Sequence, residues 1–378
     1  MAKLLFTAND KRATSLASAL RELGHELVEV PFDDIDRVTK LRAGALSFSS
    51  PRMEWWQNYQ THPLVQARRA NVFRRNAQAH ADTSDGIVMW GSWFAPVLHR
   101  SDGSAVPYVY YIDQSRSVTP DPLELKPRFP RPRGGNRRQR EGYLGSAGVF
   151  CMSRWAVEQT ARAHPGLPPS LVRWAGWGPC AFDLSAEPLE ERTGPPVVLH
   201  VGNDFYRKGV DFLVQVARRV RAEIPDVRFI VVGRDQSDYP VDLSEVEYLG
   251  LLSDREQLKQ LFRSASLFFL PNRFDRSPHV LVEAMSAGTP VVVSQQGGPG
   301  ELVTNYDVGA GAAVGDLAGY ASAILSLLRD GERRRRQGLE GKRLAASTFS
   351  WKEIAERVTS PLQRSDSQRA LHPMHTHS

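Results

Sequence analysis

Short apolar runs alternate with amphipathic segments along most of the chain, a pattern typical of parallel β-strands connected by α-helices. In the first half, the apolar runs predict strands at residues 3–7, 26–30, 86–90, 107–112, 147–152 and 171–174. In the second half, they predict strands at residues 197–202, 228–232, 246–249, 267–270 and 290–294. Segments with a 3.6-residue apolar period predict helices at residues 11–23, 153–163, 210–222, 255–265, 317–329 and 332–349. The predicted fold class is α/β.

One segment interrupts this alternation and divides the chain. Residues 186–196 (AEPLEERTGPP) are acidic, rich in proline and glycine, and without apolar periodicity, which predicts a linker. It would separate a domain over residues 1–185 from a second domain over residues 197–350. A chain of 378 residues also exceeds a single typical core. Residues 365–378 are predicted to be a disordered tail.

Composition and charge narrow the class of protein. Hydrophobic residues make up 41% of the chain and charged residues 24%, as in an ordinary soluble globule, and the net charge is +6. No apolar run reaches the length of a membrane span, and the first residues lack the long apolar core of a signal peptide. Cys151 and Cys180 have no metal-site spacing, so a reducing cytoplasm is the expected location.

The richest candidate chemistry lies between residues 267 and 301. A short helix there has recognisable ends: Ser277 is a good N-cap, Pro278 suits the first helical position, and Gly288 stands where a C-terminal glycine belongs. Most of its circumference is apolar, so the helix is expected to be buried. A strand and a Gly-rich turn follow it.

The same helix carries a narrow polar stripe of His279, Glu283 and Ser286. A buried carboxylate is costly unless it is hydrogen-bonded, and a pair of ligand hydroxyl groups would satisfy Glu283. The alternative is that Glu283 only caps a neighbouring element of the protein. Asp275 lies eight residues earlier, so both acids can face one pocket. The N–H groups at the start of the helix suit phosphate oxygens.

A second group of polar residues follows the strand at 197–202. Gly202 and Asn203 are succeeded by the basic pair Arg207 and Lys208, and such a pair at the carboxyl end of a strand can neutralise a diphosphate. No GxGxxG sequence opens a βαβ unit and no Walker A sequence is present, which argues against a dehydrogenase and a P-loop enzyme.

These motifs together resemble a known family. An acid at 275, seven intervening residues, Glu283 followed by Ala-Met, then Gly-Thr-Pro-Val-Val and a GG-x-x-E turn resemble the retaining glycosyltransferases of family 4. The resemblance implies the GT-B fold: two Rossmann-like domains facing across a cleft, with helices after residue 350 returning to the N-terminal domain, here over residues 351–364. It extends over residues 197–355, and over residues 1–185 it is architectural only.

The resemblance also implies roles for individual residues. Glu283 would bind the nucleotide ribose and Asp275, an Asp where the family usually has Glu, would lie beside the donor sugar. Lys208 would contact the donor phosphates, with Arg207 behind it. Asp113 follows the strand at 107–112, where relatives often carry a His–Asp pair directed into the cleft, and it would be catalytic together with Asp275 and Lys208; a plain turn acid is the alternative. The remaining expected donor contacts are Gly202, Asn203, Arg234, Ser277, Pro278, His279 and Val280.

The implied activity is transfer of a sugar from a UDP- or GDP-sugar to a hydroxyl acceptor with retention of configuration, and without a metal or other cofactor. The acceptor would be a sugar or glycolipid in polysaccharide, lipopolysaccharide or glycoconjugate biosynthesis. Two alternatives stay open. A GT-B-fold epimerase would use the same donor pocket, and a non-catalytic protein would bind the nucleotide sugar without transferring it.

Residues 124–141 (ELKPRFPRPRGGNRRQRE) combine many basic residues with proline and glycine, which predicts a mobile loop without regular structure. It is either a solvated loop or a basic patch for an anionic acceptor or a membrane face. Peripheral contact with the inner membrane face is the corresponding expectation for location. Nucleic acid is not an expected partner, since the segment belongs to no known binding module. Asp34 and Asp36 form a DxD sequence that is predicted to lie in a solvated loop.

Overall fold

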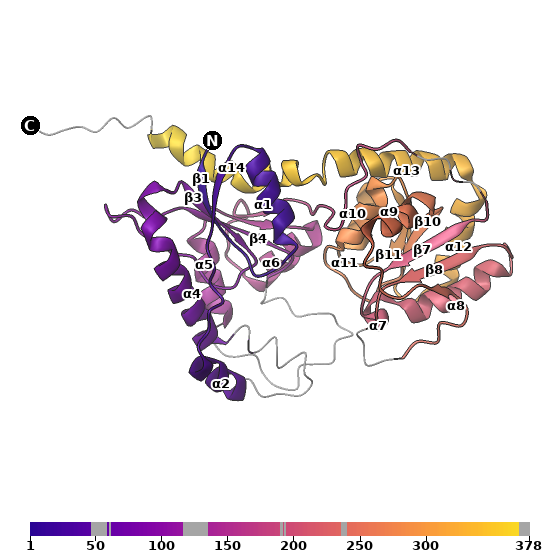
Figure 1. The fold of residues 1–378 in the computed structure, drawn as a ribbon, viewed down its shortest axis with the longest axis horizontal. Coiled ribbons are helices and arrows are strands. Elements are labelled where there is room, and N and C mark those ends of the chain that lie inside the picture. Colours follow the sequence, from indigo (N-terminus) through magenta and orange to yellow (C-terminus); the bar gives the residue numbers. More distant parts are fainter. Residues whose placement is uncertain are drawn as a thin grey trace, which may run out of the picture. The chain divides into compact units, whose positions relative to one another are not determined.

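The computed structural model describes residues 1–46, 59, 62–115, 135–189, 192, 194–235 and 240–369. These residues form two compact units (Figure 1). Unit 1 is Met1–Ala175 together with Ile354–Ser378, and unit 2 is Gly176–Glu353.

Unit 1 contains a parallel sheet of six strands in the order β2-β1-β3-β4-β5-β6. Its strands are β1 (Lys3–Thr7), β2 (Glu26–Glu29), β3 (Gly86–Trp90), β4 (Tyr108–Ile112), β5 (Gly148–Cys151) and β6 (Val172–Trp174). Its helices are α1 (Ala13–Glu22), α2 (Arg37–Leu46), α4 (Pro63–Ala77), the short 3₁₀ helix η1 (Gln78–Thr83), α5 (Gly135–Leu144) and α6 (Arg154–Ala163). The central strands β3 and β4 are apolar and wholly buried, as expected of a sheet covered on both faces.

Unit 2 contains a second six-stranded parallel sheet in the order β12-β11-β10-β7-β8-β9. Its strands are β7 (Val197–Val201), β8 (Arg228–Val232), β9 (Glu247–Tyr248), β10 (Leu267–Leu270), β11 (Val291–Ser294) and β12 (Gly309–Ala312). Its helices are α7 (Phe205–Lys208), α8 (Val210–Arg221), α9 (Arg255–Ser264), α10 (His279–Ser286), α11 (Gly297–Asn305), α12 (Leu317–Arg329) and α13 (Gly331–Ala346). Apolar residues of α8 and α12 share one buried cluster with β7, β8, β10 and β11.

The predicted α/β class and the two Rossmann-like sheets are confirmed. The predicted strands at 3–7, 86–90, 228–232 and 267–270 match β1, β3, β8 and β10 to the residue. Helix α2 and strand β12 have no counterpart in the prediction. The Gly-rich segment predicted as a turn after residue 294 is instead the start of helix α11.

The boundary between the units differs from the predicted linker at 186–196. The chain passes into unit 2 at Gly176, ten residues earlier. Arg192, in the middle of the predicted linker, donates hydrogen bonds to the carbonyl groups of Arg263, Ala287 and Gly288, all within unit 2. The segment is acidic and rich in proline, but side-chain contacts of this kind hold it to the domain that follows.

The chain returns to unit 1 at Ile354, within the long helix α14 (Trp351–Arg369), as the resemblance implied. Leu362 of α14 packs against Gly86 of β3 so closely that a Cβ on the glycine would lie 2.9 Å from the leucine methyl groups. The tail predicted from residue 365 is wrong for its first five residues, because α14 continues to Arg369. The rest of that tail lies outside the described residues.

The prediction of an irregular loop over residues 124–141 is wrong in its last part. Helix α5 begins at Gly135, and its Tyr143 is fully buried against Tyr110 and His164. A buried aromatic side chain gives this polar segment the packing that its composition alone does not offer. Residues 116–134 lie outside the described residues. Asp36 of the DxD sequence accepts the N–H of Thr39 at the start of α2 (2.8 Å).

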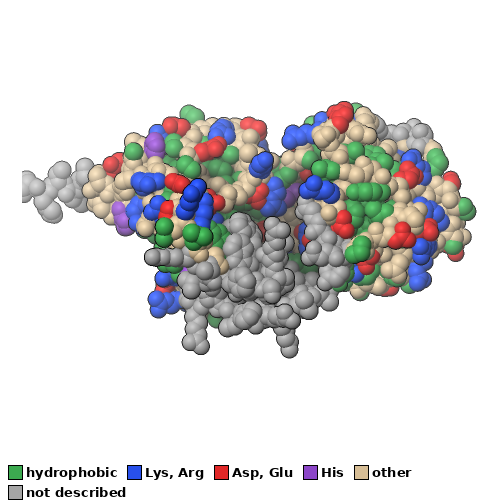
Figure 2. Space-filling model, turned by 60° about the horizontal axis from the view of Figure 1, so that its bottom comes forward, with side chains coloured by type: hydrophobic (Ala, Val, Ile, Leu, Met, Phe, Trp, Pro, Cys, Tyr) green, Lys and Arg blue, Asp and Glu red, His purple; other side chains and the backbone are tan. Residues whose placement is uncertain are grey.

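Charged side chains of both signs are interspersed over the face drawn in Figure 2, in keeping with the modest net charge of +6. No helix among the described residues is both long and apolar enough to cross a membrane.

Candidate functional site

The topology of unit 2 brings two loops together at one edge of its sheet. Strand β7 lies between β8 and β10, and the strand order reverses between β7 and β10. In open parallel sheets, ligands bind outside the carboxyl ends of the strands at such a reversal. The residues that follow β7 and β10 are Asn203–Lys208 and Pro271–Pro278. The two groups of polar residues predicted from the sequence therefore converge here.

The loop after β7 turns sharply to present its basic pair. Asp204 adopts a left-handed conformation (φ 61°), unusual for a residue other than glycine, and accepts the N–H of Arg207 at the start of α7. Gly209 ends α7 with φ 74°, and a Cβ there would lie 1.9 Å from the carbonyl oxygen of Pro271. Only glycine fits this contact between the two loops. Arg207 and Lys208 are thereby directed toward the loop after β10.

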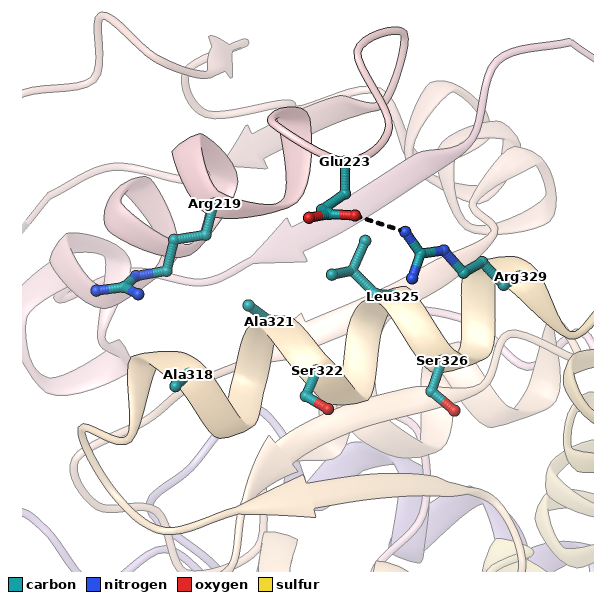
Figure 3. Close-up of a pocket in the computed structure, with 8 residues that line it drawn as sticks. All are labelled: Arg219, Glu223, Ala318, Ala321, Ser322, Leu325, Ser326 and Arg329. Carbon is teal, nitrogen blue, oxygen red and sulfur yellow. Dashed lines mark hydrogen bonds and ion pairs between the residues drawn. The ribbon is translucent and has the colours of Figure 1, made fainter.

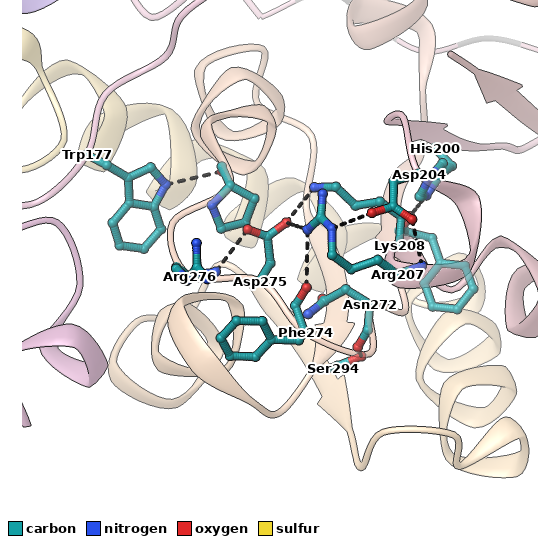
Figure 4. Close-up of polar contacts among 12 residues, drawn as sticks. Trp177, His200, Asp204, Arg207, Lys208, Asn272, Phe274, Asp275, Arg276 and Ser294 are labelled. Atoms are coloured by element: carbon teal, nitrogen blue, oxygen red, sulfur yellow. Dashed lines mark hydrogen bonds and ion pairs between the residues drawn. The ribbon is translucent and has the colours of Figure 1, made fainter. Parts of the chain in front are cut away.

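An ion cluster joins the two loops (Figure 4). Nζ of Lys208 lies 2.5 Å from Oδ2 of Asp275, and Nη1 of Arg207 lies 3.2 Å from the same oxygen. Arg207 Nε also donates to Asp204 (2.9 Å). Burial opposes ionisation of Asp275, yet the charges of Lys208 and Arg207 hold its pKa well below its usual range. Asp275 is therefore a carboxylate, and a weak base.

Two buried polar side chains, Asn272 and Ser294, hold the loop that carries Asp275. With its amide oriented to satisfy both ends, Asn272 donates to the carbonyl of Leu270 (3.0 Å) and accepts the N–H of Asp275 (3.1 Å). Ser294 at the end of β11 donates to the carbonyl of Asn272 (2.6 Å). The backbone position of Asp275 is thus set by contacts to the ends of two neighbouring strands, β10 and β11.

The glycines of α11 complete this side of the site. A Cβ on Gly297 would lie 2.2 Å from the carbonyl oxygen of Asp275, and a Cβ on Gly298 would lie 1.9 Å from that of Arg276. Real Cβ atoms do not approach a carbonyl oxygen so closely, so any larger residue would displace the loop. The two glycines of the GG-x-x-E sequence are consequently a packing requirement for the loop that carries Asp275.

Helix α10 begins one residue later than predicted. Its N-cap is Pro278 and not Ser277, and no side chain of the described residues caps it. Ser277 Oγ is buried and makes no hydrogen bond within the described part of the chain. At the other end, Gly288 (φ 69°) follows the helix, and the N–H groups of Gly288 and Thr289 bond to the carbonyls of Met285 and Ala284. This confirms the predicted C-terminal glycine.

The polar stripe of α10 faces residues 178–184, where the chain has just entered unit 2. His279 Nδ1 contacts the carbonyl of Gly178 (2.6 Å), and Ser286 Oγ accepts the N–H of Leu184 (3.1 Å). Glu283 Oε1 accepts the N–H groups of Cys180 (3.1 Å) and Ala181 (2.8 Å). The alternative interpretation, that Glu283 caps a neighbouring element, therefore holds for one of its two oxygens.

The second oxygen of Glu283 makes no hydrogen bond with the described residues, although the side chain is only 5% exposed. Burial raises the pKa of this carboxyl group, and the N–H groups of Ala181 and Cys180 and the charge of Lys208 oppose that rise. Among the described residues, Oε2 is thus an acceptor without a partner, and the charge of Lys208 acts on the same carboxyl group. This arrangement suits a ligand that donates hydrogen bonds.

Two cations secure the C-terminal end of α10. Lys342 of α13 donates to the carbonyls of Ser286 (2.9 Å) and Leu184 (2.5 Å), and Arg192 binds the carbonyls of Ala287 and Gly288. Positive charge at a helix C-terminus is favourable, and these bonds fix the axis of the helix.

The other predicted donor contacts have different surroundings. The amide oxygen of Asn203 accepts the N–H of Arg234 (2.8 Å). This bond joins the ends of β7 and β8 and occupies the amide oxygen of a residue that was expected to contact the donor. Gly202 packs near His200 and the Lys208 side chain. His200 is fully buried, its Nδ1 lies 2.9 Å from the carbonyl oxygen of Phe269, and burial lowers its pKa to about 4. Arg234 is exposed.

Asp113 belongs to unit 1 and is described by itself. It follows β4, as predicted, and its Oδ1 accepts the N–H of Gln114 (2.8 Å). This contact is that of a turn acid, and the catalytic role of Asp113 stays a prediction. In the same unit, burial raises the pKa of Cys151 to about 12.

A shallow groove lies elsewhere on unit 2, between α8 and α12 (Figure 3). Its volume is about 430 Å³, and its ends carry Arg219 and an ion pair of Glu223 with Arg329 (2.8 Å). It contains no buried titratable group, so it has none of the features of a reactive site. Among the described residues, no group of three His, Cys, Asp or Glu side chains is arranged to hold a metal ion.

Sequence reasoning missed the partners of the polar stripe. Residues 175–178 (AGWG) place a tryptophan between two glycines, and they were predicted only as a turn. In the structure, Trp177 is fully buried and donates to the carbonyl of Pro278 (3.2 Å). A buried tryptophan beside glycine indicates close backbone packing, and that signal was present in the sequence.

Part of the chain is similar in sequence to known proteins. Residues 182–344 match the family model of glycosyl transferases group 1. A glycogen synthase of Mycobacterium tuberculosis is 31% identical over 215 residues, which cover 55% of this chain and 51% of that protein. The chain thus spans about half the length of this curated relative.

Solved structures show the same fold over nearly the whole chain. An α,α-trehalose-phosphate synthase (UDP-forming) from Burkholderia vietnamiensis has a TM-score of 0.66 at 15% identity, covering 99% of this chain and 100% of that one. HepE from Anabaena, in complex with UDP, has a TM-score of 0.60 at 16% identity, covering 96% and 100%. The fold is that of the GT-B glycosyltransferases. The match to the model of glycosyl transferases group 1 covers residues 182–344, which include the ion cluster and Glu283.

Proposed function

We propose that the protein is a retaining glycosyltransferase that moves a sugar from a nucleotide diphosphate sugar, UDP- or GDP-linked, to a hydroxyl group of a sugar or glycolipid. The observation that carries this proposal is the placement of Lys208, Arg207, Asp275 and Glu283 beside the reversal of strand order in unit 2. The match of residues 182–344 to the group 1 family model and the UDP complex of a protein with the same fold support it.

Each group has a role that follows from its surroundings. Lys208 and Arg207 offer two positive charges to a diphosphate, and the N–H groups of Ser277, His279 and Val280 near the start of α10 add donors. Glu283 Oε2 would accept from the ribose hydroxyl groups. Asp275 would bind a hydroxyl group of the donor sugar, and the two cations that pair with its Oδ2 would face the phosphates.

The proposed chemistry needs no covalent enzyme intermediate. Asp275 is held ionised by two cations, which makes it a poor general base and a poor nucleophile. By resemblance to family 4, the departing phosphate would accept the proton of the attacking hydroxyl on the same face of the sugar. The two cations would stabilise the charge on the diphosphate as the glycosidic bond breaks.

A donor screen tests the function. The protein is first screened by thermal shift against UDP-, GDP- and ADP-sugars, and the donor that stabilises it is incubated with hydroxyl acceptors. Proton NMR of the product gives the anomeric configuration, and the expected result is the configuration of the donor. Turnover in EDTA is expected to equal turnover without it; loss in EDTA with recovery on adding a divalent ion would contradict metal independence.

The same assay separates the alternatives. An epimerase would convert the nucleotide sugar into a different one with no acceptor present. A binding protein would be stabilised by the donor and would release neither sugar nor nucleotide. Only formation of a glycoside with release of the nucleoside diphosphate supports the transferase.

The acceptor side of the proposal rests on charge. Arg137 and Arg138 of α5 are exposed, and they continue a basic segment whose earlier residues lie outside the described chain. We propose that residues 124–141 favour an anionic acceptor or contact with a membrane face from the cytoplasm. Nucleic acid is not among the proposed partners.

A further inference from the structure

The chain enters unit 2 and leaves it through segments that both contact helix α10. The chain enters unit 2 at Gly176 and leaves it after Glu353. Trp351, at the start of α14, donates from its indole Nε1 to the carbonyl of Pro179 (2.5 Å). The segment that leaves unit 2 is thus hydrogen-bonded to the segment that enters it, only three residues after Gly176.

The indole ring of Trp351 is closely packed. A Cβ on Gly178 would lie 2.6 Å from the indole ring of Trp351, so this ring lies directly on the glycine. The same ring stacks on His279, with centroids 6.0 Å apart and planes inclined by 24°. His279 in turn contacts the carbonyl of Gly178 (2.6 Å). Trp351, Gly178 and His279 therefore form one compact contact at the N-terminal end of α10.

The segment that Trp351 contacts continues directly to the residues that bind Glu283, the candidate ligand-binding acid. The residues after Pro179 are Cys180 and Ala181, and their N–H groups donate to Glu283 Oε1. This pair of bonds leaves only Oε2 without a partner among the described residues. A carboxylate held on one side by two N–H groups presents its other oxygen in a fixed direction.

We propose that Trp351 is a positioning residue for ligand binding at Glu283. By holding residues 177–181 against α10, it keeps Oε1 on the N–H groups of Cys180 and Ala181 and directs Oε2 toward the hydroxyl groups of a bound nucleotide. This inference rests on the proposed function and deepens it. Coupling between two sites is reciprocal, so a nucleotide at Glu283 must also stabilise the segment that connects the units.

The first test is substitution of the indole donor. Trp351→Phe keeps an aromatic ring on Gly178 and His279 and removes the N–H. Titration calorimetry with UDP and GDP is expected to show about three- to tenfold weaker binding of the preferred nucleotide, the range for loss of one hydrogen bond. The KM for the donor is expected to rise by a similar factor, with kcat unchanged.

A matched control is available in unit 1. Trp93 also donates from Nε1 to a backbone carbonyl, that of Trp90 (3.1 Å), and it is likewise partly buried. Trp93→Phe removes the same kind of bond far along the chain from α10, and nucleotide affinity is expected to stay at the wild-type value.

A double-mutant cycle shows whether Trp351 acts through Glu283. Glu283→Gln keeps an oxygen for the N–H groups of Cys180 and Ala181 and alters the ligand-facing atom. If Trp351 works by aiming that atom, adding Trp351→Phe to Glu283→Gln should weaken binding no further. Effects that multiply in the double variant would overturn the inference.

Hydrogen exchange supplies a readout that a merely structural role would not change. In the wild type, the preferred nucleotide is expected to slow exchange of the peptide containing Cys180 and Ala181 at least severalfold, and in Glu283→Gln this protection is expected to disappear. If the nucleotide binds without protecting this peptide, the inference is wrong and the proposed function survives. If the wild type binds neither UDP nor GDP, both are wrong.

Discussion

Lys208 Nζ lies 2.5 Å from Asp275 Oδ2, although the two residues are 67 positions apart in the chain. They follow the two adjacent strands β7 and β10, at the point where the strand order of unit 2 reverses. At an effective dielectric constant of about 20, an ion pair at about 4 Å gains about 4 kcal/mol of Coulomb energy before the cost of desolvation. Without ligand, Asp275 therefore occupies the cations that a diphosphate would use.

The first prediction concerns this competition. Asp275→Asn removes the negative charge beside Lys208 and Arg207, so nucleoside diphosphate binding is expected to be as tight as in the wild type or tighter. Sugar transfer is expected to fall about 100-fold or more, since a group aimed at the transition state is lost. Calorimetry and initial rates measure the two effects. Glu247→Gln, which removes a carboxylate paired with Arg228, is the control that should change neither.

The same variant has a pH signature. The pKa of Asp275 is lower in the folded protein than in the unfolded chain, so its ion pairs contribute stability above about pH 4 and lose it as the pH falls further. Asp275→Asn should accordingly be less stable than the wild type at pH 7, with the difference shrinking in acid. A difference that grows as the pH falls would argue against the ion cluster.

The second prediction separates binding from stability at Glu283. Burial raises the pKa of its carboxyl group, so ionising it at neutral pH costs folding free energy. Glu283→Gln removes this cost and keeps an oxygen for the N–H groups of Cys180 and Ala181. The ligand-free variant is expected to melt at the wild-type temperature or above, and the gain should diminish as the pH is lowered through the folded pKa.

Nucleotide binding should change in the opposite direction. Loss of charge-assisted hydrogen bonds to the ribose removes about 1.5–3 kcal/mol, which corresponds to roughly tenfold weaker binding or more. Calorimetry on the variant that melts normally gives a clean comparison. Unchanged donor affinity would show that Glu283 serves only as a cap.

The third prediction tests the packing of α11 against the Asp275 loop. Gly298→Ala places a Cβ 1.9 Å from the carbonyl oxygen of Arg276, and the loop must shift. We expect about 1–3 kcal/mol of lost stability and weaker nucleotide binding. Gly331→Ala is the control, because the nearest atom to its Cβ would be 3.9 Å away. Chemical unfolding and calorimetry on both variants make the comparison.

The fourth prediction concerns the basic segment. Neutralising Arg131, Arg133, Arg137 and Arg138 together is expected to leave nucleotide-sugar affinity unchanged. It should raise the KM for an anionic or membrane-borne acceptor, and added salt should weaken the wild-type advantage. Neutralising Arg333, Arg334, Arg335 and Arg336 of α13 removes the same number of charges from unit 2 and serves as the control. Normal acceptor kinetics in the first variant would mean that residues 124–141 are a solvated loop.

The sequence predicted the local chemistry of the site better than its partners. Strong apolar runs predicted β10 to the residue, and glycine and proline marked the end of α10. The polar stripe of His279, Glu283 and Ser286 was visible because helical periodicity is a local property. Its partner, the segment at 178–184, lies about a hundred residues away, and no local pattern connects the two.

The incorrect predictions also arise from contacts between residues that are distant in the sequence. The segment at 186–196 has the composition of a linker, yet Arg192 fixes it to α10 through carbonyl groups that any sequence would provide. Helix α5 is too polar to be predicted, and it forms because Tyr143 packs against Tyr110 and His164. In each case a long-range contact overrides the local composition.

The central claim is that the loops after β7 and β10 bind a nucleoside diphosphate through Lys208. Its most direct test is titration calorimetry of UDP and GDP with the wild type, Lys208→Ala and the control Lys259→Ala, in which Lys259 pairs with Glu256 on α9. We expect Lys208→Ala to bind the preferred nucleotide at least about tenfold more weakly, a loss of at least about 1.4 kcal/mol. Lys259→Ala should match the wild type. Equal affinity in all three proteins would contradict the assignment of this site.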